Sequence, residues 1–442
     1  MFQSNVKYVE IPEVDEEERR RSTIDQIEKL TLQIIQQINL QTFPKVTYGI
    51  GNVREQRFSC PEDLSSRANE AGVSTQESFD SSKSLSWVQS DNENREDRGV
   101  DGDRNSFDSS KSLSWISVTD DEKNRVSDNE ENRPRTEATQ SGTRRSMTVD
   151  FRRRGSRKNL ALILTVTSHV HKLLINRTSK TRRALYYELQ TEPFTATLAR
   201  TQRTIDAAVN HVASLLDRAP WELAFTATSK GLVSGDLTLT FSGRESVTCN
   251  AEGGVLIPQN IHRITSIRTS AKYVLVVEKD SVFQRLLAEH CPQFLNCILI
   301  TGKGYPDINT RMLVSLLGNR LNIPVYVLVD ADPFGVEIMC IYRFGSMVRS
   351  REHGDMVCPG ARWIGIHPSE FSALGMSPIA LTRADISRIR SLEGRSYCDE
   401  KLSEELKILK KGKVEIEALA SLSYRFLTTV YLPRKINANE YF

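Results

Sequence analysis

The segment VYVLVDADPFG, residues 325–335, is a run of apolar residues with high strand propensity that ends in two aspartates. Two earlier segments, YVLVVEKD (273–280) and CILITGKGYPD (297–307), have the same form. Short continuous apolar runs are typical of strands that are buried on both faces. Because helical segments separate the three runs, the sequence predicts an α/β domain with a largely parallel sheet over residues 255–442.

Carboxylates follow two of these runs: Glu278 the first, and Asp330 with Asp332 the third. Ligands bind such sheets at the carboxyl ends of the strands. Three carboxylates gathered there would repel one another, and a divalent cation would remove the conflict. An all-oxygen ligand set suits Mg²⁺, with Mn²⁺ as the alternative. Either aspartate could instead cap the helix that begins near Pro333.

Basic residues lie near the same edge, in the segment TGKGYPDINTR, residues 301–311. Gly302 and Gly304 allow the backbone to approach a ligand closely. Lys303 and Arg311 are therefore candidates for contact with phosphate. An ordinary turn between a strand and a helix is the simpler explanation of the segment.

The segment SKTRRALYYELQ, residues 179–190, contains two adjacent tyrosines that cannot share one face of a helix. Leucines four residues apart mark the buried side, so Tyr186 lies on its flank and Tyr187 points away. Counting back by four and by seven places Arg183 and Lys180 on the face of Tyr187. The sequence thus predicts an exposed phenol beside two cations. Such tyrosines are common on helix surfaces, so the rest of the chain must decide whether this one reacts.

Helices are also predicted on both sides of the tyrosine helix, at 159–177 and 201–217. Two short extended segments follow, WELAFTA and DLTLTF. Three helices and then a two-stranded hairpin is the order of a winged helix. We therefore expect residues 159–254 to form a winged-helix domain, a module that usually binds DNA.

An amphipathic helix is predicted at 22–40, within an N-terminal segment of residues 1–60. Ser22 and Asp25 resemble a capping box at its start. The apolar face is consistent with packing on its own domain and with docking onto a partner.

Residues 61–158 are polar, first acidic and then basic, and we expect a disordered linker. The ten-residue unit SFDSSKSLSW occurs at 78–87 and again at 106–115, either as a duplicated docking or phosphorylation motif or as a neutral duplication. The basic run at 144–158 suits a nuclear localisation signal, an arm that contacts DNA or a solvated linker.

Charge is unevenly distributed along the chain. Residues 62–131 hold 18 acidic and 8 basic residues, whereas residues 132–160 hold 9 basic and 2 acidic, so the acidity is segregated from a basic folded part. The hydrophobic fraction of 39% fits a folded part diluted by a polar tract. Seven cysteines without a CxxC pair indicate reduced thiols and argue against a zinc site. We expect no membrane span and no signal peptide.

Four segments together, RRALYYE, VLVVEKDSVF, LITGKGYPDINTR and VLVDADPFG, resemble the meiotic double-strand-break transesterase. That family is the eukaryotic relative of the A subunit of topoisomerase VI. The resemblance covers roughly residues 155–442. It implies a multidomain α+β and α/β chain, in which a winged-helix domain with the reactive tyrosine precedes a Toprim metal-binding domain.

The resemblance also implies roles for particular residues. The family's nucleophile matches Tyr187, and its arginine four residues earlier matches Arg183. Its acidic metal ligands match the three carboxylates Glu278, Asp330 and Asp332. Family members commonly carry an acidic residue where this chain has Ala184, which removes a salt bridge but not the nucleophile.

The implied activity is cleavage of double-stranded DNA in meiotic recombination. The tyrosine attacks a backbone phosphodiester, becomes linked to a DNA 5′ end and releases a 3′ hydroxyl. The resemblance implies a homodimer in which the tyrosine of one protomer faces the metal of the other. We expect this dimer to act in the nucleus on chromosomes, within a larger complex that includes a topoisomerase VI B-like protein or other accessory proteins bound through residues 22–40. Lys180, Lys303 and Arg311 are expected to contact the DNA.

Two other functions are weighed against this one. A catalytically silent DNA-binding scaffold could keep the fold, although the intact tyrosine and carboxylates argue against it. A metal phosphatase could use Asp330 as its nucleophile, but that class needs Thr or Val where this chain has Phe334. A covalent adduct between the protein and DNA distinguishes all three.

Overall fold

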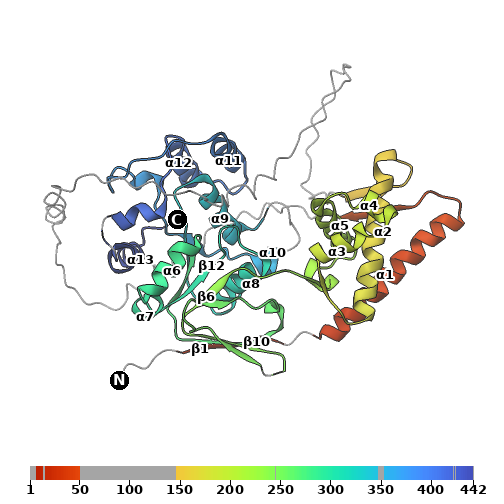
Figure 1. Cartoon of the computed structure of the whole chain (residues 1–442), viewed down its shortest axis with the longest axis horizontal. Coiled ribbons are helices and arrows are strands. Elements are labelled where there is room, and N and C mark those ends of the chain that lie inside the picture. Colours follow the sequence, from red (N-terminus) through yellow and green to blue (C-terminus); the bar gives the residue numbers. More distant parts are fainter. Residues whose placement is uncertain are drawn as a thin grey trace, which may run out of the picture. The chain divides into compact units, whose positions relative to one another are not determined.

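The computed structural model describes residues 6–12, 15–49, 146–243, 245–346, 353–421, 423 and 425–441. The acidic tract and both copies of the ten-residue repeat lie outside the described residues, as does most of the linker predicted at 61–158. Within the described residues, two hydrophobic cores organise the chain, one around the helices near the tyrosines and the other around the larger sheet (Figure 1).

The larger sheet has six strands in the order β14-β13-β11-β12-β6-β9. Its strands β11 (Tyr273–Val277), β12 (Cys297–Thr301), β13 (Val325–Leu328) and β14 (Ala361–Trp363) are parallel. The short strands β6 (Leu232–Ser234) and β9 (Val255–Leu256) complete it in antiparallel orientation. Every residue of β11, β12 and β13 is buried, which confirms the largely parallel sheet predicted from the apolar runs.

Helices follow and cover these strands. They are α6 (Asp280–Ala288), α7 (Cys291–Phe294), α8 (Ile308–Ser315) with its continuation η5 (Leu316–Arg320), α9 (Pro333–Phe344), α10 (His353–Met356), η6 (Pro368–Glu370), α11 (Arg383–Glu393), α12 (Glu400–Leu409), η7 (Ile416–Ser421), η8 (Leu427–Tyr431) and α13 (Leu432–Asn437). None of the helices in the described part of the chain is long and apolar enough to cross a membrane.

A second, antiparallel sheet has the order β1-β10-β7-β8. It joins β1 (Lys7–Glu10), β10 (Ile264–Thr269, after the turn η4, Ile261–Arg263), β7 (Leu237–Phe241) and β8 (Ser246–Thr248). The hairpin predicted between WELAFTA and DLTLTF is therefore wrong. Strand β5 (Phe225–Thr226) pairs with β4 (Lys180–Thr181), whereas β7 lies between β10 and β8.

Helices dominate the part of the chain that carries the tyrosines. Its elements are α1 (Glu16–Asn39), β2 (Lys45–Gly49), β3 (Ser146–Asp150), α2 (Arg154–Ile175), α3 (Arg182–Gln190), α4 (Pro193–Leu198), α5 (Gln202–Leu215) and η3 (Pro220–Leu223). Figure 1 shows α1 lying along α2. Ile27 and Ile34 of α1 are buried in this core, so the helix predicted at 22–40 packs on its own domain. It begins earlier than predicted, because Asp15 rather than Ser22 caps it by accepting the amides of Glu17 and Glu18.

Two observations concern the residues near the predicted domain boundaries. Strand β3 and the first turn of α2 lie within the segment assigned to the linker, because β3 finds a partner in β2, about 100 residues earlier in the chain. Phe225 belongs to the helical core and Val233 to the core of the larger sheet, so some residues before the boundary expected at 254 pack with the larger sheet.

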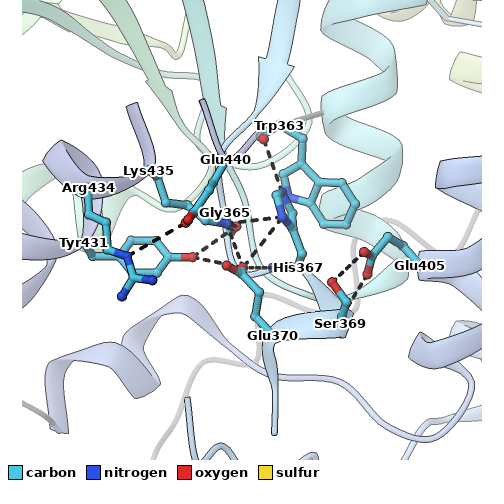
Figure 2. A network of polar contacts seen from close by, with 10 residues as sticks. All are labelled: Trp363, Gly365, His367, Ser369, Glu370, Glu405, Tyr431, Arg434, Lys435 and Glu440. Carbon is cyan, nitrogen blue, oxygen red and sulfur yellow. Dashed lines mark hydrogen bonds and ion pairs between the residues drawn. The ribbon is translucent and has the colours of Figure 1, made fainter. Parts of the chain in front are cut away.

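Helix α13 is fixed to the larger sheet by a buried lysine, Lys435, which is 1% exposed. Its ammonium donates to the carbonyl of Gly365 at 3.1 Å and to Glu370 Oε2 at 2.7 Å, and it lies 3.2 Å from His367 Nδ1. The Tyr431 hydroxyl donates to the same carbonyl at 3.2 Å (Figure 2). Burial and the nearby Lys435 lower the pKa of His367 to about 3, so this imidazole is neutral at neutral pH. The end of the chain thereby stabilises the loop after β14.

Candidate functional site

Helix α3 presents one tyrosine to solvent and packs the other. The Thr181 hydroxyl caps the helix by accepting the amide of Ala184 at 3.1 Å. Leu185 is fully buried one residue later, and this fixes the rotation of the helix. As predicted, Tyr187 points outward with 55% of its surface exposed, while the half-buried Tyr186 packs against the helical core.

Arg183 lies one turn before Tyr187 on the same face. Its Nη2 donates to the Tyr187 hydroxyl at 3.2 Å, and its Nε lies 3.4 Å from that oxygen. Lys180 does not share this face, contrary to the prediction. It lies in β4, before the Thr181 cap, and forms an ion pair with Glu188. The exposed phenol therefore has one cation beside it.

The three carboxylates lie at the carboxyl ends of β11 and β13. Glu278 Oε2 accepts the backbone amide of Asp330 at 3.1 Å. Asp332 Oδ1 caps α9 by accepting the amide of Gly335 at 2.6 Å, so the capping role considered for one aspartate is real. Gly335 is required here, because a Cβ would lie 2.5 Å from the Asp330 carbonyl oxygen and 3.1 Å from Glu278 Oε2.

Burial and mutual repulsion make these carboxylates hard to ionise together. Burial, with the charges of Asp330 and Asp332, raises the pKa of Glu278 to about 8. Burial and then Asp330 raise the pKa of Asp332 to about 6, and burial also raises the pKa of Asp330. This is the electrostatic conflict that a divalent cation would relieve.

The carboxylates are not arranged as a finished metal centre. No three His, Cys, Asp or Glu side chains in the described residues converge closely enough to hold an ion. Protein groups already occupy the oxygens: Asp330 Oδ1 accepts the amide of Ile416 at 2.8 Å, and Asp330 Oδ2 lies 2.9 Å from Lys279 Nζ. The all-oxygen donor set still fits a hard divalent cation, provided that Asp330 is released.

A segment from the C-terminal part of the chain crosses the aspartates. We call residues Lys413–Glu417 the strap. Its Val414 forms two backbone hydrogen bonds with Ala331, at 2.9 and 3.1 Å. The strap also brings Glu415 and Glu417 within 3.5 and 2.7 Å of Lys279 Nζ. The sequence analysis did not identify these partners. Lys279 is marked in the sequence only by its position next to Glu278, and no local pattern marks the strap.

The glycine-rich loop after β12 reaches the same edge, because the amide of Gly304 donates to the carbonyl of Glu278 at 2.9 Å. Lys303 has a left-handed φ of 52°, and its ammonium lies 3.2 Å from Asp280, so it is half-exposed at this edge. Arg311 is 4% exposed on α8. A buried guanidinium does not reach a surface phosphate, so the contact with DNA predicted for Arg311 is not available in this structure.

Two groups thus emerge, each in its own core. Tyr187 and Arg183 stand on the helical core, and the carboxylates with Lys279 stand on the core of the larger sheet. Within the described residues, no hydrogen bond or ion pair joins one group to the other. Tyr187 and the three carboxylates therefore form two separate groups within one chain.

Comparison with protein families assigns both groups. Residues 273–436 match the family model for the Toprim domain of Spo11 and of the topoisomerase 6 A-type protein, and this match spans the carboxylates. Residues 158–224 match the model "Type IIB DNA topoisomerase", which spans the tyrosines. Toprim domains generally bind divalent metal ions.

Three curated proteins illustrate the similarity. The human meiotic recombination protein SPO11 is 39% identical over 290 residues, covering 64% of this chain and 72% of the relative. A meiotic recombination protein of Drosophila melanogaster is 40% identical over 296 residues, covering 66% and 86%. The A subunit of DNA topoisomerase 6 from Arabidopsis thaliana is 30% identical over 281 residues, covering 62% and 64%.

Proposed function

Because this chain belongs to the family of Spo11 and the A subunit of topoisomerase VI, we propose that it is the topoisomerase-like enzyme that makes DNA double-strand breaks in meiotic recombination. One observation carries the proposal: an exposed Tyr187 hydroxyl accepts a hydrogen bond from Arg183 on the same helix face. A solvated phenol beside a fixed guanidinium is suited to attack a phosphodiester, whose negative charge the guanidinium also attracts.

The reaction is a transesterification. The Tyr187 oxygen attacks a backbone phosphorus, the new bond joins the tyrosine to the 5′ phosphate, and the bond to the 3′ oxygen breaks. The phenolic proton leaves to solvent, and the released 3′ oxygen gains a proton to become a hydroxyl. Arg183 orients the phenol and stabilises charge on the phosphate during attack.

Glu278, Asp330 and Asp332 would hold the divalent ion, Mg²⁺ or Mn²⁺. The bound ion would supply positive charge that offsets the charge of the DNA phosphate. Lys303, half-exposed at the same edge, and Lys180, paired with Glu188 beside the tyrosine helix, are retained as candidate contacts for the DNA backbone.

Two protomers build the complete site in this proposal. Support comes from the two separate cores, since Tyr187 stands on one core and the carboxylates on the other, and no hydrogen bond or ion pair joins these two groups within the described residues of one chain. Helices α2, α3 and α5, of which α3 carries the two tyrosines, form the helical part of the proposed winged-helix domain.

The dimer is proposed to work in the nucleus, on chromosomes, with a topoisomerase VI B-like protein or another accessory protein. Helix α1 is the proposed contact. It packs on its own domain with one face and leaves Leu32, Ile35 and Ile38 between 45% and 58% exposed on the other.

The test is recovery of the protein covalently attached to DNA 5′ ends after incubation with plasmid and Mg²⁺, with and without partner proteins. Wild type should form the adduct, and chelation of the metal should abolish it. Tyr187→Phe should form none while still binding DNA, and the matched change Tyr186→Phe should form it at near wild-type yield. A silent scaffold binds DNA without any adduct, and an adduct from Tyr187→Phe would refute the assigned nucleophile.

A further inference from the structure

Lys279 is surrounded by carboxylates. Its ammonium lies 2.9 Å from Asp330 Oδ2, 2.7 Å from Glu417 Oε2 and 3.5 Å from Glu415 Oε2. One of these partners belongs to the proposed metal site, and the other two belong to the strap. Lys279 therefore bridges the site and the strap, and its side chain remains 27% exposed.

The ammonium competes directly with a metal ion. Asp330 is buried, and each of its oxygens has a protein partner, Ile416 on one side and Lys279 on the other. A divalent ion needs a carboxylate oxygen that faces it without a competing positive charge in contact. Releasing Asp330 from Lys279 provides such an oxygen.

We propose that Lys279 is an internal counter-ion that pairs with Asp330 when no metal is bound and moves onto Glu415 and Glu417 when a divalent cation binds. This inference rests on the proposed metal role of the three carboxylates. In this proposal Lys279 is a positioning residue that controls the affinity of the site for its ion. The strap carboxylates Glu415 and Glu417 bind the ammonium after the ion displaces it.

The exchange requires only a side-chain movement. The strap stays in place because Val414 remains bonded to the backbone of Ala331, and because Lys413 pairs with the buried Asp385 at 3.0 Å. Glu417 already contacts the ammonium at 2.7 Å, so Lys279 keeps a partner after it leaves Asp330. The cost of releasing Asp330 is thereby reduced.

Direct measurement of Mn²⁺ binding tests the first half of the proposal. The full-length protein, free of DNA, is titrated with Mn²⁺, and the free ion is measured by its electron paramagnetic resonance signal. Lys279→Met should bind Mn²⁺ about tenfold more tightly than wild type, since a positive charge beside a dication is removed. Lys279→Arg and Lys410→Met should both bind like wild type, the latter because its pair with Glu393 lies outside the cluster.

Changing the strap carboxylates tests the second half of the proposal, that they receive the displaced ammonium, and should change Mn²⁺ affinity in the opposite direction. In the double change Glu415→Gln and Glu417→Gln, the ammonium has no second position, so Mn²⁺ should bind several-fold more weakly. In the triple variant that adds Lys279→Met, the weakening should disappear. The proposal would be overturned if Lys279→Met bound Mn²⁺ no more tightly than wild type, or if neither wild type nor Lys279→Met bound Mn²⁺. It would also be overturned if the loss of Glu415 and Glu417 weakened Mn²⁺ binding in the triple variant, which lacks Lys279.

Failure of this inference is distinguishable from failure of the proposed function. Circular dichroism of each variant verifies folding, and the metal titration contains no DNA. Tighter Mn²⁺ binding by Lys279→Met without any adduct in wild type would uphold the counter-ion and reject the cleavage. An adduct in wild type, together with unchanged Mn²⁺ binding by Lys279→Met, would uphold the cleavage and reject the counter-ion.

Discussion

Replacing Glu278 by glutamine should stabilise the metal-free protein at alkaline pH, even though the same change should weaken metal binding. Burial and the neighbouring aspartates raise the pKa of Glu278 to about 8, whereas an unfolded glutamate has a pKa of about 4.3. The folded state therefore binds more protons than the unfolded state between these values, and stability falls as pH rises through that window. Glutamine carries no charge at any pH, so the loss should disappear.

The size of the effect follows from the shift. At about 1.4 kcal/mol per pKa unit, full ionisation of Glu278 would cost an upper limit of about 5 kcal/mol. Because Glu278 is partly exposed and water screens its charge, we expect about 2 kcal/mol at pH 8. For a domain of this size, that corresponds to roughly 4–8 °C in melting temperature.

The measurement is a thermal melt in EDTA at pH 5 and pH 8. Glu278→Gln should melt within about 1 °C of wild type at pH 5 and about 4–8 °C above it at pH 8. A matched change at an exposed glutamate of α12, Glu404→Gln, should follow wild type at both. Saturating Mn²⁺ at pH 8 should raise the melting temperature of wild type and of Glu404→Gln but not that of Glu278→Gln. If Glu278→Gln melted below wild type at pH 8, or if the difference were the same at both pH values, the inferred repulsion would be wrong.

Three further changes probe other parts of the site. Arg183→Met should lower the adduct yield about 100-fold, because this is the typical cost of losing one group that stabilises transition-state charge. Its affinity for DNA in a gel-shift assay should change little, and an adduct yield equal to that of wild type would exclude a role for this arginine. A purified heterodimer of Tyr187→Phe and Asp330→Asn chains should nick supercoiled plasmid without linearising it, because one composite site stays intact, whereas wholly uncut plasmid beside active wild-type dimer would indicate self-sufficient protomers. Gly335→Ala should lower stability by about 1–3 kcal/mol in a denaturant titration and should weaken Mn²⁺ binding, since its Cβ meets the Asp330 carbonyl at 2.5 Å; a variant as stable as wild type would show that this contact is not tight.

Local patterns predicted the features that depend on local geometry. The apolar runs before Glu278 and Asp330 identified buried parallel strands, because such strands must be apolar on both faces. The exposed face of Tyr187 followed from helical spacing, which holds over one or two turns. The same spacing failed for Lys180, since Thr181 caps the helix and the residue before the cap leaves the helical path.

Features that depend on distant partners were not predictable in this way. The alternating pattern of β7 indicates a strand but not its partner, so the hairpin was assigned to neighbours in sequence. The strap lies more than 80 residues after the aspartates that it covers, and no spacing rule relates Glu417 to Lys279.

The pairing of β1 with β10 has a consequence for how this chain folds as it is made. Lys7–Glu10 hydrogen-bonds to Ser266–Thr269, so about 250 residues are translated between the two strands. At ~10 residues per second, β1 waits about 25 seconds outside the ribosome with its backbone groups unpaired. The helical core, with α1 directly after β1, has all of its elements available before β10 emerges. β1 leaves the ribosome before the other strands of the described residues and is thus among the last of them to find its partner, so a molecular chaperone would meet it as an open edge.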